Sequence, residues 1–247
     1  MTAAIEVKNV SKKFKLYHNR ALTLKDLLVS WHRQKYDIFW ALKDISFTLP
    51  QGVSMGLIGS NGSGKSTLLK LIGRILYPDS GGINVHGRVS TLLELGAGFH
   101  YDFTGRENIY FNASILGFSS KEIKSKIDEI ISFAEVGDFI DMPVRNYSTG
   151  MFARLGFAVA IHVDPDIILI DEVLAVGDLS FKQKCLKKIR EFKKREKTII
   201  IVSHSLKDIE DYCDVALWLD CGEMKMFGSA REVSSAYKSS LDLENSK

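Results

Sequence analysis

The chain has 247 residues, of which 45% are hydrophobic and 26% are charged, as in an ordinary globular protein with one large domain or two small ones. Its 33 basic and 30 acidic residues leave a net charge of +3, which is too small to favour nucleic acid as a partner. No apolar run approaches the ~20 residues that cross a bilayer, and the N-terminus lacks the apolar segment of a signal peptide, so we expect the chain to stay in the cytoplasm. Cys185, Cys213 and Cys221 are widely spaced, which predicts reduced thiols rather than a disulfide framework or a zinc site.

Apolar runs of strand length alternate with helical patterns, and this predicts an α/β fold. Strands are expected at residues 4–10, 45–49 and 53–58, and a helix at 66–76. Two later strands, at 167–170 and 198–202, are apolar throughout, as expected for parallel strands that helices cover on both faces. The sequence therefore predicts a central, mostly parallel sheet.

Residues 15–40 form an insertion before the second of these strands. A short amphipathic helix is predicted there by four apolar side chains with helical spacing, Leu24, Leu27, Leu28 and Trp31. Basic and aromatic side chains follow it, a mixture that suits a membrane surface or a membrane partner. A helix folded onto its own domain is an equally weighted alternative.

A phosphate-binding loop is predicted between the third strand and the helix that follows it. The loop reads Gly-Ser-Asn-Gly-Ser-Gly-Lys-Ser-Thr and fits the pattern GxxxxGK[ST]. Its glycines let the backbone approach a phosphate, so that several N–H groups and the positive end of the helix dipole point at one anion. Lys65 would neutralise the β- and γ-phosphates of ATP, and Ser66 would offer its hydroxyl to Mg²⁺. The nucleotide-binding candidates are Gly59, Ser60, Asn61, Gly62, Ser63, Gly64, Lys65, Ser66 and Thr67.

Two carboxylates, Asp171 and Glu172, end the apolar strand at 167–170. Together with the phosphate loop they predict that the chain binds and hydrolyses ATP.

A helix-rich stretch separates the loop from these carboxylates, and we place a helical subdomain at about residues 95–163. Thr104 with Glu107, and Ser119 with Glu122, form capping boxes that open helices at 107–116 and 121–136. A further helix is predicted at 152–163 behind Tyr-Ser-Thr-Gly-Met, where Ser148 can cap the helix and Gly150 allows an anion to approach closely.

The segment 147–151 resembles the signature sequence of ATP-binding cassette (ABC) proteins, in which a serine and a glycine contact the γ-phosphate of ATP held by a partner subunit. Its Tyr, Thr and Met replace the commoner Leu, Gly and Gln. This form resembles the ATP-binding subunits of exporters of bacterial cell-surface polysaccharides: O-antigen, capsule and teichoic acid. The sequences at 93–100 and 104–108 indicate the same branch.

The resemblance covers essentially the whole chain and implies the P-loop NTPase fold of an ABC cassette. Such a cassette has a RecA-like parallel-sheet core, an antiparallel β subdomain and an inserted helical subdomain. We expect one ABC ATPase domain over residues 1–238 and a polar tail at 239–247.

Roles for individual residues also come from the resemblance. Asp171 would hold Mg²⁺ through water, and Glu172 would orient and deprotonate the attacking water. His204, just past a strand, matches the switch histidine that contacts the γ-phosphate. With Lys65, these complete the catalytic candidates.

Further contacts follow from the same comparison of motifs. Asp178 occupies the D-loop, which crosses the dimer interface. Glu94 stands where most cassettes carry a glutamine that senses Mg²⁺ and the membrane subunit, and it joins Ser66 and Asp171 as a metal candidate. The adenine base would stack on Phe14, with Tyr17 as the alternative.

The function that the resemblance implies is ATP-driven export of a lipid-linked cell-surface polysaccharide, most similar to O-antigen, across the bacterial inner membrane. The chain would work as a homodimer on the cytoplasmic face with two transmembrane permease subunits, and no nucleic-acid partner is expected. The alternative is a soluble, non-transport ABC ATPase acting on ribosomes or DNA. Such proteins usually carry two cassettes or a long coiled coil, and the sequence has neither. A P-loop kinase is a weaker third alternative, because it would not explain the signature helix or His204.

Overall fold

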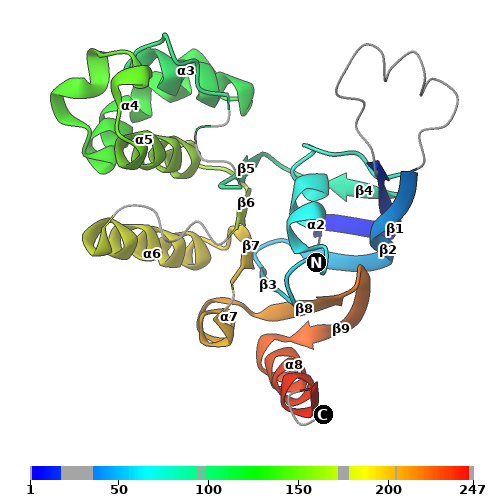
Figure 1. The fold of residues 1–247 in the computed structure, drawn as a ribbon. Helices are drawn as coiled ribbons and strands as arrows, with labels where there is room; N and C mark the ends of the chain where they lie inside the picture. Colours follow the sequence, from blue (N-terminus) through cyan, green and yellow to red (C-terminus); the bar gives the residue numbers. More distant parts are fainter. Residues whose placement is uncertain are drawn as a thin grey trace, which may run out of the picture.

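The computed structural model describes residues 2–17, 36–93, 96, 98–171, 178–203 and 205–244. Their strands form two sheets (Figure 1). The smaller sheet is antiparallel and has the order β2-β1-β4, with strands Tyr36–Pro50, Ala3–Tyr17 and Ser80–Val85. The larger sheet has six strands in the order β5-β6-β7-β3-β8-β9, which are Val89–Thr91, Ile167–Ile170, Thr198–Val202, Ser54–Ile58, Val215–Asp220 and Glu223–Ser229.

The larger sheet is parallel from β5 to β8, and only β9 pairs antiparallel. The prediction of a mostly parallel sheet is therefore confirmed. Every residue of β3, β6 and β7 is buried. The alternating side chains of β6 enter different cores: Leu169 belongs to one cluster and Ile168 and Ile170 to the other. Both faces of the sheet are thus covered, which explains why these strands are apolar throughout.

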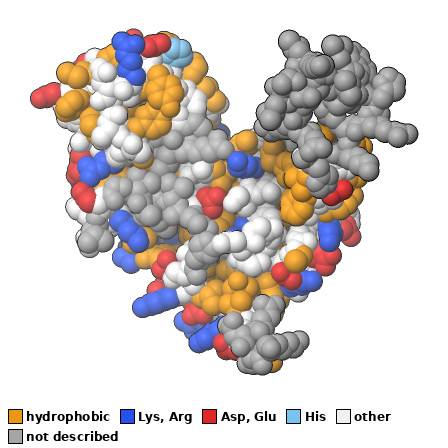
Figure 2. All heavy atoms as spheres, in the orientation of Figure 1, with side chains coloured by type: hydrophobic (Ala, Val, Ile, Leu, Met, Phe, Trp, Pro, Cys, Tyr) orange, Lys and Arg blue, Asp and Glu red, His pale blue; other side chains and the backbone are white. Residues whose placement is uncertain are grey.

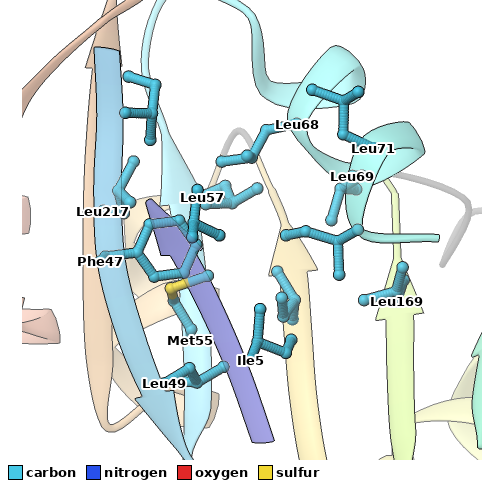
Figure 3. Close-up of a cluster of buried hydrophobic side chains, with 14 of the residues drawn as sticks. Ile5, Phe47, Leu49, Met55, Leu57, Leu68, Leu69, Leu71, Leu169 and Leu217 are labelled. Atoms are coloured by element: carbon cyan, nitrogen blue, oxygen red, sulfur yellow. The ribbon is translucent and has the colours of Figure 1, made fainter. Parts of the chain in front are cut away.

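The first core cluster joins the two sheets to helix α2, Lys65–Ile72. In Figure 3, Leu68 and Leu69 of α2 lie near Leu57 of β3, and Ile5 of the antiparallel sheet lies among the same group of side chains. This packing fixes the start of α2 against the end of β3. The second cluster lies on the opposite face, where it packs α6 (Leu179–Lys194), α7 (Leu206–Tyr212) and α8 (Ala230–Glu244) against the sheet.

Three helices with a core of their own lie between β5 and β6: α3 (Gly105–Ile115), α4 (Ser120–Ala134) and α5 (Thr149–His162). The short 3₁₀ helices η1 (Gly137–Asp141) and η2 (Val144–Asn146) connect α4 to α5. Both predicted capping boxes are confirmed, since Thr104 and Ser119 each accept a hydrogen bond from the third backbone N–H of their helix and receive the reciprocal glutamate.

Helix α2 and the C-terminal segment differ from the sequence-based expectation. The helix predicted at 66–76 ends at Ile72: the N–H of Gly73 still bonds the carbonyl oxygen of Leu69, but Arg74 turns into the left-handed region with φ 58° and donates its N–H to Leu71. The polar tail expected from residue 239 is helical as far as Glu244, because α8 buries Ala230 and Val233 against the second core and continues outward from there.

The insertion at 15–40 is strand at both of its described ends. β1 continues to Tyr17 and β2 begins at Tyr36, and the two pair as a hairpin that extends beyond β4. The amphipathic helix predicted around Leu24 and Trp31 lies outside the described residues.

Candidate nucleotide-binding site

The predicted phosphate loop lies between the end of β3 and the start of α2, and its backbone requires glycine at two positions. Gly59 has φ 145° and Gly64 has φ 108°. A Cβ on Gly64 would lie 2.5 Å from the carbonyl oxygen of Ala41, and one on Gly59 would collide with the carbonyl oxygen of Leu219. The loop is therefore held tightly from behind by β2 and β8. Gly62 faces open space, with nothing within 4 Å of its Cβ position.

Lys65 lies over this loop with only 7% of its surface exposed. Its ammonium donates to the carbonyl oxygens of Gly59 (2.8 Å) and Ser60 (2.9 Å). These two bonds hold the loop backbone in a curve around the Lys65 ammonium. The positive charge therefore lies inside the curve of the loop. An anion brought to this curve would meet Lys65 directly.

Ser66 and Asp171 meet at the mouth of the loop, where the hydroxyl of Ser66 donates to the carboxylate of Asp171 over 3.2 Å. Ser66 belongs to α2 and Asp171 follows β6, so the topology of the parallel sheet brings the two together at its carboxyl edge. A hydroxyl beside a carboxylate is a donor set of the hard oxygen type that Mg²⁺ prefers.

The residues of the loop fit a nucleotide phosphate with Mg²⁺. The first turn of α2 has N–H groups that lack partners within the helix, and the helix dipole makes this end positive. The hydroxyl of Ser63 is buried without a hydrogen-bond partner among the described residues, and Asn61 and Gly62 are exposed to an incoming ligand. Lys65 supplies the charge that balances the phosphates, while Ser66 and Asp171 supply oxygen ligands.

The predicted signature segment forms the start of α5. Ser148 is the N-cap and accepts a hydrogen bond from the backbone N–H of Met151 at 3.2 Å. Ser148, Thr149 and Gly150 are all exposed, and the space at Gly150 contains only the Ser148 hydroxyl within 4 Å. In Figure 1, α5 lies on the other side of β5 and β6 from α2, so the signature segment and the phosphate loop of one chain are separate surfaces.

Asp178 is the N-cap of α6. One of its carboxylate oxygens accepts from the backbone N–H of Phe181 at 2.9 Å, and the other accepts from Arg154 of α5, also at 2.9 Å. The bond from the Phe181 N–H lowers the pKa of Asp178 most, and Arg154 lowers it further. The carboxylate is therefore ionised and fixed in direction at neutral pH.

The two candidates for adenine stacking lie on the β1–β2 hairpin, with Phe14 36% and Tyr17 48% exposed. Phe14 is opposite Phe39 in the register, and Tyr17 is opposite Tyr36. Because the two candidates are three residues apart on one strand, their side chains point to opposite faces of the hairpin. The ammonium of Lys12 lies 5.6 Å from the centre of the Phe14 ring.

Three predicted residues, Glu94, Glu172 and His204, lie outside the described part of the chain. Among the described residues, no group of three His, Cys, Asp or Glu side chains forms a metal site, so Ser66 and Asp171 are the described part of the proposed one.

Sequence reasoning missed the roles of two residues near these segments. Asn108 is completely buried and makes four hydrogen bonds with the backbone of residues 100–104, which its motif alone did not reveal. Arg154 joins α4, α5 and α6, and no local pattern marks it, because its partners lie 19 and 24 residues away.

Comparison with known proteins agrees with this geometry. Residues 42–175 match the family model of the ABC transporter. The chain is 47% identical to the O-antigen export system ATP-binding protein RfbB of Klebsiella pneumoniae, over 98% of this chain and 100% of that protein. It is 49% identical to the RfbB protein of Myxococcus xanthus over 97% of this chain, but it spans only 56% of that longer relative.

The solved structures give the same fold. The ATP-binding cassette MJ0796, in a dimeric post-hydrolysis state bound to ADP and Pi, superposes with a TM-score of 0.72 at 20% identity, over 92% of this chain and 98% of that one. The phosphate loop, the Ser66–Asp171 pair and the near full-length relatives lead to one assignment. The chain belongs to the ABC transporter family and is an ATP-binding cassette ATPase.

Proposed function

We propose that two copies of this chain bind two molecules of ATP between them and use hydrolysis to drive export of a lipid-linked cell-surface polysaccharide, of the O-antigen type, across the bacterial inner membrane. The main observation that supports the proposed dimer is that the start of α5 is exposed. Ser148 and Gly150 present a capped helix N-terminus that the described residues leave uncovered, on a different side of the sheet from α2. A helix N-terminus favours an anion, and a second copy can bring one there on its own phosphate loop.

Within each such site, the residues of both copies would have distinct tasks. Gly59 to Thr67 would hold the phosphates, with Lys65 balancing their charge, and Phe14 or Tyr17 would stack on the base. Ser66 and Asp171, with Glu94, would hold Mg²⁺, which when bound polarises the phosphate oxygens. Glu172 would take a proton from the attacking water, and His204 would contact the γ-phosphate. From the second copy, Ser148 and Gly150 would close on that phosphate, and Asp178 would lie at the interface.

A transmembrane partner is supported by the surface beside the helical insertion. A groove of about 550 Å³ lies between β5 and α3, lined by Arg74, Ile75, Arg88, Asn112, Ile115 and Leu116. Figure 2 shows hydrophobic side chains gathered on the part of the surface that α3–α5 form. Of the residues that line the groove, Ile75 is 43% and Ile115 is 61% exposed. Exposed apolar side chains around a groove are typical of a protein-binding surface.

Every helix among the described residues is too short or too polar to cross a bilayer. In the proposed complex the chain would attach to the cytoplasmic face of the inner membrane through two permease subunits. The name of the Klebsiella relative, which the chain matches over its whole length, supports O-antigen as the class of glycan.

The test is affinity purification of the Glu172→Gln variant with ATP and Mg²⁺ from detergent-solubilised host membranes, followed by mass spectrometry. Loss of the general base should slow hydrolysis by about 100- to 10,000-fold while ATP stays bound, and this holds the complex in its closed state. Lys65→Ala, which should not bind ATP, serves as the control. Co-purification of a multi-helix permease encoded among glycan-synthesis enzymes supports the proposal. Recovery of ribosomes or DNA-bound proteins alone contradicts it and favours the non-transport alternative.

A further inference from the structure

The turn between β8 and β9 contacts the phosphate loop from behind. It consists of Cys221 and Gly222, since β8 ends at Asp220 and β9 begins at Glu223. Both turn residues have positive φ, 47° and 80°, as in a type I′ hairpin turn. The N–H of Gly222 donates to the carbonyl oxygen of Ser63 in the phosphate loop over 3.1 Å. The loop is thus bonded to a hairpin that its sequence motif does not include.

This bond orients the peptide unit between Ser63 and Gly64. A peptide unit is planar and trans, so its C=O and N–H point in opposite directions. Because the Ser63 carbonyl oxygen faces Gly222, the Gly64 N–H points away from the turn. Gly64 is the N-cap of α2, and its N–H makes no hydrogen bond within the part of the chain that the structure describes. The Gly64 N–H is therefore available at the positive end of a helix, where an anion is favoured.

The same turn is anchored on its other side to β2. The carbonyl oxygen of Gly222 accepts from the backbone N–H of Lys43 at 2.8 Å. The ring of Phe227 in β9 lies 5.8 Å, centre to centre, from the ring of Phe47 in β2. Gly222 therefore connects the phosphate loop to the antiparallel sheet through its own backbone.

A side chain at position 222 has no room. Its Cβ would lie 2.9 Å from the carbonyl oxygen of Ala41 in β2. The same carbonyl oxygen lies 2.5 Å from the Cβ position of Gly64, so both glycines pack against one peptide group of β2. A Cβ at position 222 must move either the turn or β2, and both movements displace the partner of the Ser63 carbonyl oxygen. The motif accounts for glycine at position 64, whereas only the packed structure accounts for glycine at position 222.

We propose that Gly222 is a positioning residue for nucleotide binding, which holds the Ser63–Gly64 peptide so that the Gly64 N–H is directed at the phosphates before ATP arrives. This role of Gly222 rests on the proposed nucleotide site and adds to it a residue from outside the motifs. Donors that are already oriented bind an anion more tightly than donors that binding must first turn. Gly222 acts only through the peptide that it orients.

The experiment measures the binding of two fluorescent ligands, trinitrophenyl-ATP and trinitrophenyl-adenosine, to the full chain with Mg²⁺. Gly222→Ala should raise the dissociation constant of trinitrophenyl-ATP by about 10- to 100-fold, the range for one hydrogen bond to a charged group. The dissociation constant of trinitrophenyl-adenosine should stay within about twofold of the wild type, because that ligand has no phosphate. A purely structural role would weaken the binding of both ligands.

The matched control is Gly117→Ala, between α3 and α4. Gly117 has φ 86°, close to the 80° of Gly222, but nothing lies within 4 Å of its Cβ position. Both substitutions place alanine at positive φ and should lower the unfolding temperature. Gly117→Ala should leave both dissociation constants within about twofold of the wild type.

A second substitution separates backbone strain from the clash with β2. Asparagine tolerates positive φ better than alanine does, but it carries the same Cβ. Gly222→Asn should therefore weaken the binding of trinitrophenyl-ATP about as much as Gly222→Ala does. Recovery of wild-type binding in Gly222→Asn would contradict the proposed role, because it would make the strain of the turn the cause.

If neither Gly222 variant folds, NMR on the wild type tests the same bond. The amide hydrogen of Gly222 should exchange with solvent as slowly as those of β8. Addition of inorganic pyrophosphate with Mg²⁺ should shift the amide resonance of Gly64 and leave that of Gly117 in place. A Gly222 amide that exchanges as fast as an exposed one overturns the inference.

The proposed nucleotide site and the role of Gly222 fail in different ways. A wild type that does not bind trinitrophenyl-ATP overturns the proposed site and the role of Gly222 with it. A wild type that binds this ligand, with a Gly222→Ala variant that binds it equally well, overturns only the role of Gly222. Equal weakening of both ligands in Gly222→Ala does the same, because it would mean a disturbed fold rather than a turned peptide.

Discussion

The hydroxyl of Ser66 donates to the carboxylate of Asp171 across 3.2 Å, although the two residues are 105 positions apart. Three features of the fold produce this contact. The first core cluster seats α2 against the sheet, β6 is parallel to its neighbour β7, and the glycine loop turns the chain sharply from β3 into α2. The carboxyl edge of a parallel sheet is where such side chains converge. The site is thus a consequence of the topology, which places a helix start beside a strand end.

This contact predicts how the site responds to loss of the Ser66 hydroxyl or of the Asp171 charge. Ser66→Ala and Asp171→Asn should each reduce Mg²⁺-dependent ATP hydrolysis on the order of 100-fold or more, because both groups are proposed to hold Mg²⁺, whose polarisation of the phosphate is worth several kcal/mol of transition-state stabilisation. Titration with a fluorescent ATP analogue should show that binding without Mg²⁺ changes much less than binding with it.

The control for these variants is Ser114→Ala, an exposed serine on α3. It should hydrolyse ATP at the wild-type rate. Equal losses of nucleotide binding with and without Mg²⁺ in the Ser66 variant would contradict a metal role and favour a direct contact with phosphate.

A buried amide explains the shape of residues 100–104, which lead into α3. Asn108 accepts from the backbone N–H of His100 at 2.7 Å and donates to the carbonyl oxygens of His100, Phe103 and Thr104 at 3.0, 3.1 and 3.0 Å. Asn108→Ala removes every one of these bonds at a position with no exposed surface. The free energy of unfolding should fall by about 2–3 kcal/mol, because buried backbone groups are left without partners.

Urea unfolding followed by circular dichroism measures this change. Asn146→Ala is the matched control, since the side chain of Asn146 is exposed at the end of η2, and it should stay within about 0.5 kcal/mol of the wild type. A similar loss in both variants would show that the hydrogen bonds of Asn108 are not the cause.

The pattern of a few neighbouring residues in the sequence was enough to predict those elements of the fold that depend only on neighbouring residues. The apolar strands β6 and β7, the capping boxes of α3 and α4, and the phosphate loop each carry their explanation within a few residues. By contrast, the outer half of the β1–β2 hairpin, beyond the strand predicted at 4–10, is exposed on both faces, so no buried face identifies it as part of the strand. Strands β4, β5, β8 and β9 were not predicted either. β4 and β5 are short, and in β9 exposed residues alternate with half-buried ones rather than with fully buried ones.

The residues of the site likewise divide into those that sequence motifs predict and those that they do not. Lys65, Ser66 and Asp171 follow from motifs, and the structure places them together. The bridge from Arg154 to Asp178 depends on three helices meeting at one guanidinium, and such a contact cannot be read from spacing on one helix. Bridges of this kind therefore have to be read from the packed structure, whereas the candidate phosphate contacts follow from the loop sequence alone.

The three cysteines should differ sharply in reactivity. Burial raises the pKa of the Cys185 and Cys213 thiols to about 12, so both are fully protonated at pH 8. Cys221 is exposed at a turn. Only the thiolate attacks a disulfide reagent. Ellman's reagent at pH 8 should therefore modify one thiol per chain quickly in the native protein and all three after unfolding in urea.

Cys221→Ser tests the assignment of the reactive thiol. This variant should lose the fast phase and keep the two thiols that react only on unfolding. Rapid reaction of two or three thiols in the native wild type would mean that the second core opens far more often than its packing implies.

Asp214 should make the stability of the sheet depend on pH. One of its oxygens accepts from the N–H and hydroxyl of Ser54 at the start of β3, at 2.9 and 2.6 Å, and the other pairs with Lys193 of α6 at 2.8 Å. Partial burial raises the pKa of Asp214, but Lys193 and Ser54 together outweigh it and hold the pKa below the ordinary value of 3.8. The folded state thus binds this proton less tightly than the unfolded state does.

A carboxylate with a depressed pKa adds stability above its unfolded pKa and loses that contribution as the pH falls through its folded pKa. Asp214→Asn should accordingly be less stable than the wild type by a constant amount between pH 6 and pH 8, on the order of what an exposed, hydrogen-bonded ion pair contributes. The difference should shrink below about pH 4, the unfolded pKa of aspartate. Urea unfolding of both proteins at pH 7, 5, 4 and 3 measures it. A difference that stays the same at pH 3 would show that the loss comes from altered packing at β3 rather than from the charge of Asp214.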